Sequence, residues 1–118
     1  MRERMRASRL KAGSDQIDIK EDLGAMVDIE FLVQYLVLQH AAAHPEITRW
    51  TDNVRLLQAL AETGIVPGAT AYRLRQAYLI YRAVAHRLNL QERSTLIDRH
   101  RFEHLRNWVH RFWQQTLA

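Results

Sequence analysis

The chain has 118 residues, with 17 basic and 13 acidic side chains, so its formal net charge is +4 with histidine neutral. This length accommodates one hydrophobic core and excludes a multidomain enzyme. The sequence has no cysteine, which excludes disulfides, thiolate metal sites and cysteine nucleophiles. No stretch is apolar for long enough to cross a bilayer, and the first residues lack the apolar segment of a signal peptide. We therefore expect a cytoplasmic protein with no membrane partner.

The first part of the chain predicts an arm followed by a strand. Residues 1–12 carry only a thin apolar stripe, so a helix there needs a partner. After Gly13 and Ser14, residues 16–20 alternate between polar and apolar, which is typical of a short strand. Because one strand cannot form a sheet, we interpret residues 1–22 as an arm and strand left from a preceding domain that carries the other strands.

The rest of the chain, residues 23–118, predicts an all-α domain, a bundle of about four to five helices. Few glycines and prolines and many good helix formers favour long helices with few connections. The periodicity of apolar residues indicates helices at 26–43, 53–63, 69–88 and 101–117. Apolar side chains surround nearly the whole of the first helix, which predicts a central, buried position. Thr51 or Asp52 is expected to cap the second helix, and residues 89–98 lose the periodicity.

Signatures of common enzyme classes are absent, including a Gly-rich phosphate loop, GxSxG and HExxH. His100 and His104 have the i, i+4 spacing that zinc sites use, but the sequence indicates no third ligand, so we expect surface histidines and no metal site. The arginines are spread over every helix among acidic residues, and no helix-turn-helix spacing is present. We therefore expect no nucleic-acid partner, with a basic nucleic-acid-binding domain kept as an alternative.

Polar side chains gather where the predicted strand turns into the first helix. They are Asp18, Lys20, Asp28, Glu30 and Gln34, with Gly24 at the turn. Residues 30 and 34 are neighbours on a helix, but residue 28 lies about 200° away from residue 30, so the two acids do not face one target. Two interpretations stay open. Either Asp28 interacts with the helix N-terminus and Glu30 pairs with an arginine of another helix, or this junction lines a cleft between two domains.

The runs DIK, GAMVDIEFLVQYLVLQHA and RWTDNVRLLQAL closely resemble the glutamine synthetase (glutamate-ammonia ligase) adenylyltransferase/adenylyl-removing enzymes. The resemblance is to the helical domain that follows the nucleotidyltransferase domain. The family pattern is an aspartate and a lysine on a strand, paired glycines, and Asp-Ile-Glu-Phe opening the helix. The matching positions are Asp18, Lys20, Gly24, Asp28, Ile29, Glu30, Phe31 and Gln34. Ala25 stands where the family has the second glycine.

The resemblance implies a parent enzyme with two copies of a transferase domain plus helical domain. One copy attaches AMP from ATP to a tyrosine of glutamine synthetase, and the other removes the AMP by phosphorolysis. The implied partners are glutamine synthetase, the PII signalling protein and the preceding nucleotidyltransferase domain, and the implied cofactors of the parent are Mg²⁺ and ATP. The Asp-Ile-Glu-Phe form, and the end of the chain soon after its last amphipathic helix, predict the C-terminal copy.

In the family, the magnesium-binding carboxylates follow a Gly-Ser motif upstream of this segment. Gly13, Ser14 and Asp15 are followed by no second acid at strand spacing, so we interpret them as a loop. We expect no catalytic residue and no bound cofactor in this chain itself, because nucleotidyl transfer needs those metal-binding carboxylates. The resemblance makes the polar residues of the junction candidates for a domain seam or for contact with substrate.

A second hypothesis is that the domain is a pure interaction module that binds PII or another regulatory protein. The arginine-rich faces of the helices at 69–88 and 101–117 would suit an acidic partner.

Overall fold

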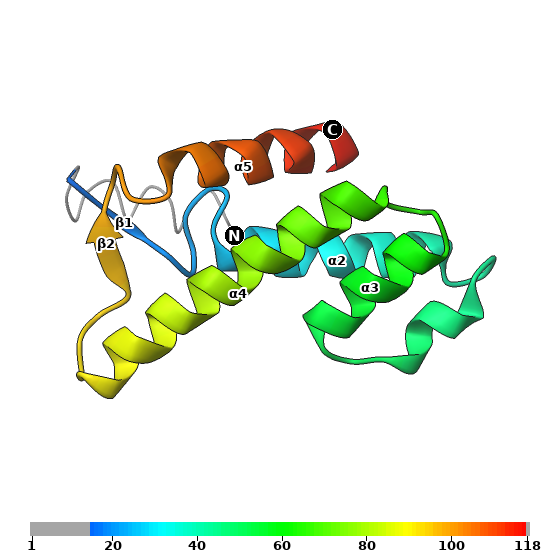
Figure 1. The fold of residues 1–118 in the computed structure, drawn as a ribbon, viewed down its shortest axis with the longest axis horizontal. Helices are drawn as coiled ribbons and strands as arrows, with labels where there is room; N and C mark the ends of the chain where they lie inside the picture. Colours follow the sequence, from blue (N-terminus) through cyan, green and yellow to red (C-terminus); the bar gives the residue numbers. More distant parts are fainter. Residues whose placement is uncertain (1–14, 118) are drawn as a thin grey trace.

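The computed structural model describes residues 15–117 of the chain (Figure 1). The expected arm at residues 1–12 therefore lies outside the described residues. Between residues 15 and 117 the chain forms four α-helices, one 3-10 helix and two short strands. In chain order they are β1 (Gln16–Asp18), α2 (Met26–His40), η1 (Pro45–Arg49), α3 (Asn53–Glu62), α4 (Gly68–Leu90), β2 (Leu96–Asp98) and α5 (Glu103–Leu117).

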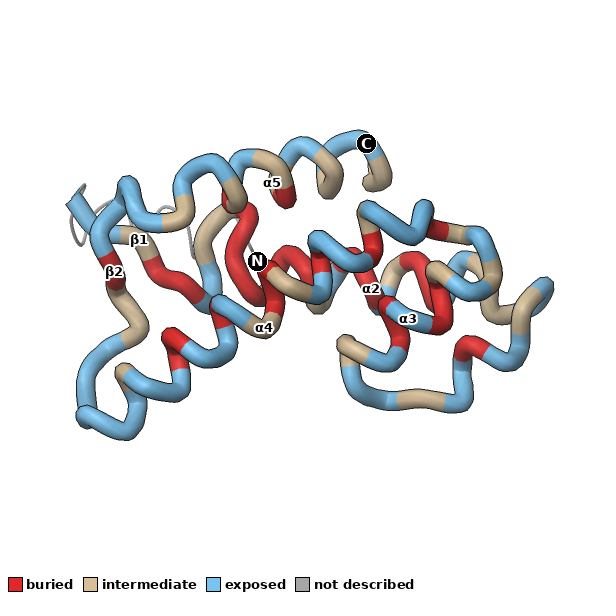
Figure 2. The backbone as a smooth tube through the Cα atoms, viewed as in Figure 1, coloured by how far each residue is buried: buried red, intermediate tan, exposed pale blue. Residues whose placement is uncertain are grey.

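Helix α2 lies at the centre of the bundle, as its sequence predicts. It packs against α3, α4 and α5, and its Ile29, Leu32 and Val33 are fully buried (Figure 2). Burying large aliphatic side chains is the main favourable contribution to folding, about 1.5 to 3 kcal/mol for each. The helix is not covered on every side, however, because Phe31 is 50% exposed and Leu38 is 79% exposed.

The other helices lie close to their predicted bounds, with local reasons for each end. The Asp52 side chain caps α3 by accepting a hydrogen bond from the Arg55 backbone N–H at 2.9 Å, as predicted. Helix α4 extends further than predicted and buries Tyr81 completely. Helix α5 begins at Glu103 rather than at residue 101, because Phe102 has a φ of 59°, outside the right-handed helical region.

The strand pairing differs from the prediction. β1 pairs antiparallel with β2, with Gln16 opposite Asp98 and Asp18 opposite Leu96. The interpretation that the partner of β1 must lie in another domain is therefore wrong, and the strictly all-α prediction becomes a mostly helical fold with one two-stranded sheet. The sequence does not predict the second strand, because three residues are too few to show the alternation of polar and apolar side chains that marks a strand, and the connection around them is mostly polar.

None of the helices in the part of the chain from 15 to 117 is long and apolar enough to span a membrane.

Candidate functional site at the strand-to-helix junction

The turn after β1 is organised by two aspartates. Asp18 is buried, and its Oδ1 accepts hydrogen bonds from the Lys20 backbone N–H at 2.9 Å and from the Thr95 hydroxyl at 2.7 Å. The Asp22 carboxylate accepts a hydrogen bond from the Asp18 backbone N–H at 2.7 Å. Because short polar side chains bond readily to nearby backbone groups, this pair fixes a tight turn. Asp18 also joins the turn to the segment that leads into β2.

Gly24 lies at the closest approach of this turn to α5. Its φ is +72°, in the left-handed region that favours glycine. A Cβ atom at this position would lie 2.0 Å from the backbone oxygen of Arg106. The turn is therefore covered by α5 and is inaccessible at Gly24.

The buried Arg106 side chain holds the start of α5 in place. Its guanidinium group donates hydrogen bonds to the backbone oxygens of Arg99 and Arg101, the latter at 3.2 Å. These carbonyls belong to the segment between β2 and α5. The Arg106 side chain thus fixes the segment that leads into α5, and α5 is the helix that covers Gly24.

Asp28 connects the turn to α2. It is fully buried, and its Oδ2 accepts a hydrogen bond from the Gly24 backbone N–H at 2.6 Å. Asp28 also lies in the first turn of α2, where a negative charge interacts favourably with the helix dipole. The interpretation that Asp28 interacts with the helix N-terminus is confirmed.

Glu30 joins three helices through a neutral partner. The Tyr78 hydroxyl of α4 donates a hydrogen bond to Glu30 Oε2 at 3.0 Å and accepts one from the Asn53 side-chain amide of α3 at 3.3 Å. The prediction that Glu30 pairs with an arginine is therefore wrong. Burial, followed by the bond to Glu30, raises the pKa of Tyr78 above its ordinary value.

Lys20 and Gln34 are exposed. Within residues 15–117 no hydrogen bond connects either of them, or Asp18, to Glu30. The structure therefore divides the predicted site. Asp18, Gly24 and Asp28 form a buried junction, Glu30 belongs to a polar contact between helices, and Lys20 and Gln34 face solvent.

The two histidines that share a zinc-like spacing are both exposed. His100 Nδ1 lies 3.4 Å from the Glu103 carboxylate, and its Nε2 accepts a hydrogen bond from Arg99 at 3.2 Å. Over the described range, no three histidine, aspartate or glutamate side chains converge to hold a metal ion.

The sequence does not identify four residues that make these contacts, namely Asn53, Tyr78, Thr95 and Arg106. Tyr78 fits the apolar periodicity of its helix, which gives no sign that its buried hydroxyl has a polar partner. A polar residue on the otherwise apolar α2, such as Glu30, is a signal that such a hydroxyl lies opposite. Nothing in the local pattern of Arg106 distinguishes it from the solvent-facing arginines of the chain.

The model of the GlnD PII-uridylyltransferase family matches residues 1–113. The chain belongs to this family. Over 96 residues it is 44% identical to the bifunctional glutamine synthetase adenylyltransferase/adenylyl-removing enzyme of Pseudomonas putida, which covers 81% of this chain and 10% of the relative. Over 110 residues it is 41% identical to the enzyme of the same description from Pseudomonas syringae pv. tomato, covering 93% of this chain and 11% of the relative.

The chain therefore spans about a tenth of the length of these relatives. The resemblance inferred from the residues of the junction is confirmed by relatives of that description.

Proposed function

We propose that this chain is the helical domain that follows the nucleotidyltransferase domain in a bifunctional enzyme regulating nitrogen assimilation. The parent transfers AMP from ATP to a tyrosine of glutamine synthetase and removes it by phosphorolysis. The observation that carries this proposal is the 44% identity to an enzyme of that description over 81% of the chain. Glutamine synthetase and PII are the proposed partners, ATP and Mg²⁺ the proposed cofactors of the parent, and the cytoplasm the proposed compartment.

Within this proposal, the domain itself performs no chemistry. Residues 23–118 are the proposed helical unit, and residues 1–22 are proposed to lead in from the nucleotidyltransferase domain, with β1 joined to the helical unit by its pairing with β2. The Asp-Ile-Glu-Phe sequence at residues 28–31 favours the C-terminal copy. Residues of the buried junction hold the fold, so the exposed Lys20 and Gln34 are the best candidates for contact with the neighbouring domain or with substrate.

A transfer assay on the parent protein tests the reaction. The parent is expected to label glutamine synthetase from radioactive ATP in the presence of Mg²⁺, and the isolated chain to label nothing. The description of the matching family favours a second candidate, in which the parent transfers UMP from UTP to PII. Labelling of PII from UTP, with none of glutamine synthetase from ATP, would replace our proposal by this second one.

Two variants of the parent protein test the seam. Lys20→Ala and Gln34→Ala are expected to lower kcat/KM while leaving the free energy of unfolding within about 0.5 kcal/mol, because both side chains are exposed. Arg111→Ala and Gln114→Ala are matched controls on exposed positions of α5. Unchanged kinetics in both variants would show that Lys20 and Gln34 do not form a functional seam.

The alternative of a pure interaction module draws support from the arginines of α4. It predicts that the isolated chain retains PII or another regulatory protein in a pull-down, and that high salt releases it. Retention of glutamine synthetase or PII that salt does not weaken would argue against this charge-based version.

A further inference from the structure

Helix α4 has an unbalanced charge. Its 23 residues include Arg73, Arg75, Arg82 and Arg87 and no aspartate or glutamate. Among residues 15–117, none of these guanidinium groups has a carboxylate within ion-pair distance. Two of them are held by aromatic rings: the Arg73 guanidinium lies 4.3 Å from the ring centre of Trp108, and that of Arg82 lies 5.7 Å from the ring of Tyr78.

The solvent side of the same helix carries apolar side chains. Tyr72 is 61% exposed, Ile80 38% and Leu90 71%, so α4 holds three of the five exposed large hydrophobic residues of the described chain. By the helical repeat of 100° per residue, Tyr72 and Leu90 share one direction and Ile80 lies about 80° from it. The completely buried Tyr81 points to the opposite side, and Figure 2 shows α4 alternating between buried and exposed positions.

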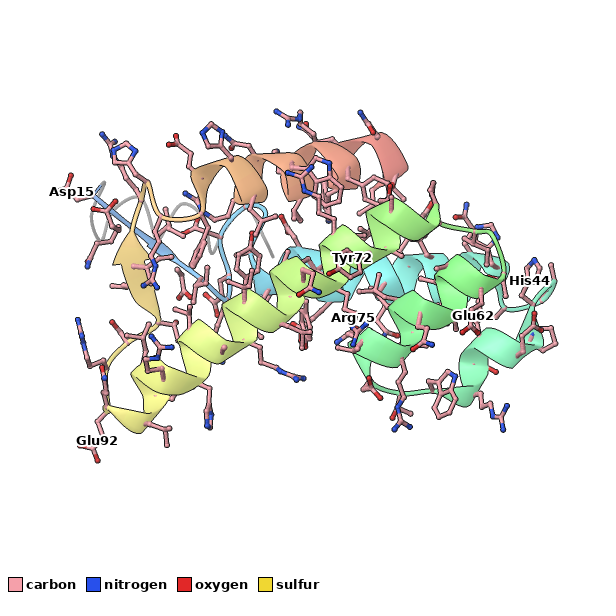
Figure 3. All side chains as sticks on the ribbon, in the orientation of Figure 1. Asp15, His44, Glu62, Tyr72, Arg75 and Glu92 are labelled. Atoms are coloured by element: carbon pink, nitrogen blue, oxygen red, sulfur yellow. The ribbon has the colours of Figure 1, made fainter. Side chains whose placement is uncertain are left out.

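A hollow of about 230 Å³ opens between α3 and α4, next to Tyr72. It is lined by the buried Leu57 and Ala71 and by the exposed Tyr72 and Arg75. Figure 3 labels Tyr72 and Arg75 on successive turns of α4, beside α3. Exposed tyrosines and arginines beside a pocket are the residues that most often dominate the energy of protein interfaces.

We propose that this surface, defined by Tyr72, Arg75, Arg82 and Leu90, binds an acidic amphipathic helix of a partner protein. The stretch from Tyr72 to Leu90 is about 27 Å long, which matches a partner helix of about 18 residues. Apolar residues on one side of that helix pack on Tyr72 and Leu90, and one of them enters the hollow. Flanking Asp and Glu residues pair with the arginines. The proposal stands on the surface alone and does not depend on which nucleotide the parent enzyme transfers.

Charge and apolarity together favour a protein segment over nucleic acid. A phosphate backbone pairs with arginines but gives Tyr72 and Leu90 nothing apolar to contact. An acidic amphipathic helix offers carboxylates to the arginines and apolar side chains to the exposed apolar residues. Charge complementarity also speeds the encounter, while the apolar contacts slow dissociation.

A peptide titration tests the proposal. The probe is a fluorescein-labelled synthetic helix of 18 residues, with leucines on one face and glutamates on the other, and the readout is fluorescence anisotropy with the 118-residue chain. We expect saturable binding that weakens in high salt. Tyr72→Ala and Arg75→Glu are each expected to weaken it about thirtyfold, the effect of a typical interface hot spot. Arg111→Glu, an exposed position of α5, is the matched control and is expected to leave it unchanged.

A peptide of the same composition in scrambled order, and a short DNA duplex, complete the design. Weak binding of both supports an acidic amphipathic helix as the ligand. The proposal is overturned if the ordered peptide does not saturate, if the scrambled peptide binds equally well, if duplex DNA binds more tightly and displaces the peptide, or if the two α4 variants bind like the control. Circular dichroism of each variant establishes that a loss of binding is not a loss of helix.

Discussion

Replacing Gly24 by alanine tests the central packing contact of the junction. The added Cβ atom would lie 2.0 Å from the backbone oxygen of Arg106, whereas ordinary contacts begin near 3.4 Å. Neither partner is a flexible side-chain end, so the turn or α5 must move by roughly 1.4 Å. Such overpacking typically costs about 1 to 3 kcal/mol. The left-handed backbone at Gly24 adds about 1 to 2 kcal/mol for a residue with a Cβ atom.

The same substitution at Gly64 separates these two contributions. Gly64 has a φ of +77°, close to that of Gly24, but a Cβ atom there would meet nothing within 4 Å. Gly64→Ala is therefore expected to cost only the backbone part, about 1 to 2 kcal/mol. Gly24→Ala is expected to cost about 2 to 5 kcal/mol in total, a large share of the 5 to 15 kcal/mol that stabilises a typical domain.

Urea denaturation followed by circular dichroism at 222 nm measures both values in one format. In thermal unfolding, the excess cost at Gly24 corresponds to a melting temperature lower than that of Gly64→Ala by about 4 °C or more. Hydrogen exchange should show faster exchange in α5 for the Gly24 variant alone. Equal destabilisation by the two substitutions, with α5 equally protected in both, would refute the close packing of α5 on the turn.

The remaining predictions concern hydrogen bonds and ionisation in the core. Asp28→Ala is expected to cost about 2 to 3 kcal/mol in urea denaturation, because it leaves the buried Gly24 N–H without its acceptor. Tyr78→Phe is expected to cost about 1 kcal/mol in the same assay, through loss of the bond to Glu30. Burial raises the pKa of both Tyr78 and Tyr81. A raised pKa contributes stability that is complete below the unfolded value near 10 and is lost as the pH rises through the folded value. The free energy of unfolding should therefore fall above pH 10, and fall less steeply in a variant with both tyrosines replaced by phenylalanine.

The helices were predictable because their signal is local. The apolar stripe of α3, its Asp52 cap and the left-handed Gly64 that follows are encoded within about a dozen consecutive residues. The central position of α2 followed from apolar residues around most of its circumference. Helix ends differ from the prediction by a few residues. α4 runs two residues beyond its predicted end, and α5 begins only after Phe102, whose positive φ is incompatible with a right-handed helix.

The candidate site was predictable only in part. Sequence alone placed Asp28 in the first turn of a helix and identified Gly24 as a turn residue. It did not reveal that α5 covers Gly24, nor that Glu30 is bonded to Tyr78 from a segment 48 positions away. The location of a residue on its own helix is a local property, but the choice of its partner depends on how the helices pack.

The sequence by itself determined that this is a small helical unit, where its helices run, and that the junction at residues 18–34 resembles one family. Tertiary structure alone decided that β1 pairs with Leu96–Asp98, that Asp18 and Gly24 are buried, and that the arginines of α4 face solvent beside exposed apolar side chains. The physical reason is distance along the chain. Periodicity acts over a few residues, whereas burial and pairing depend on contacts between segments that only the folded path brings together.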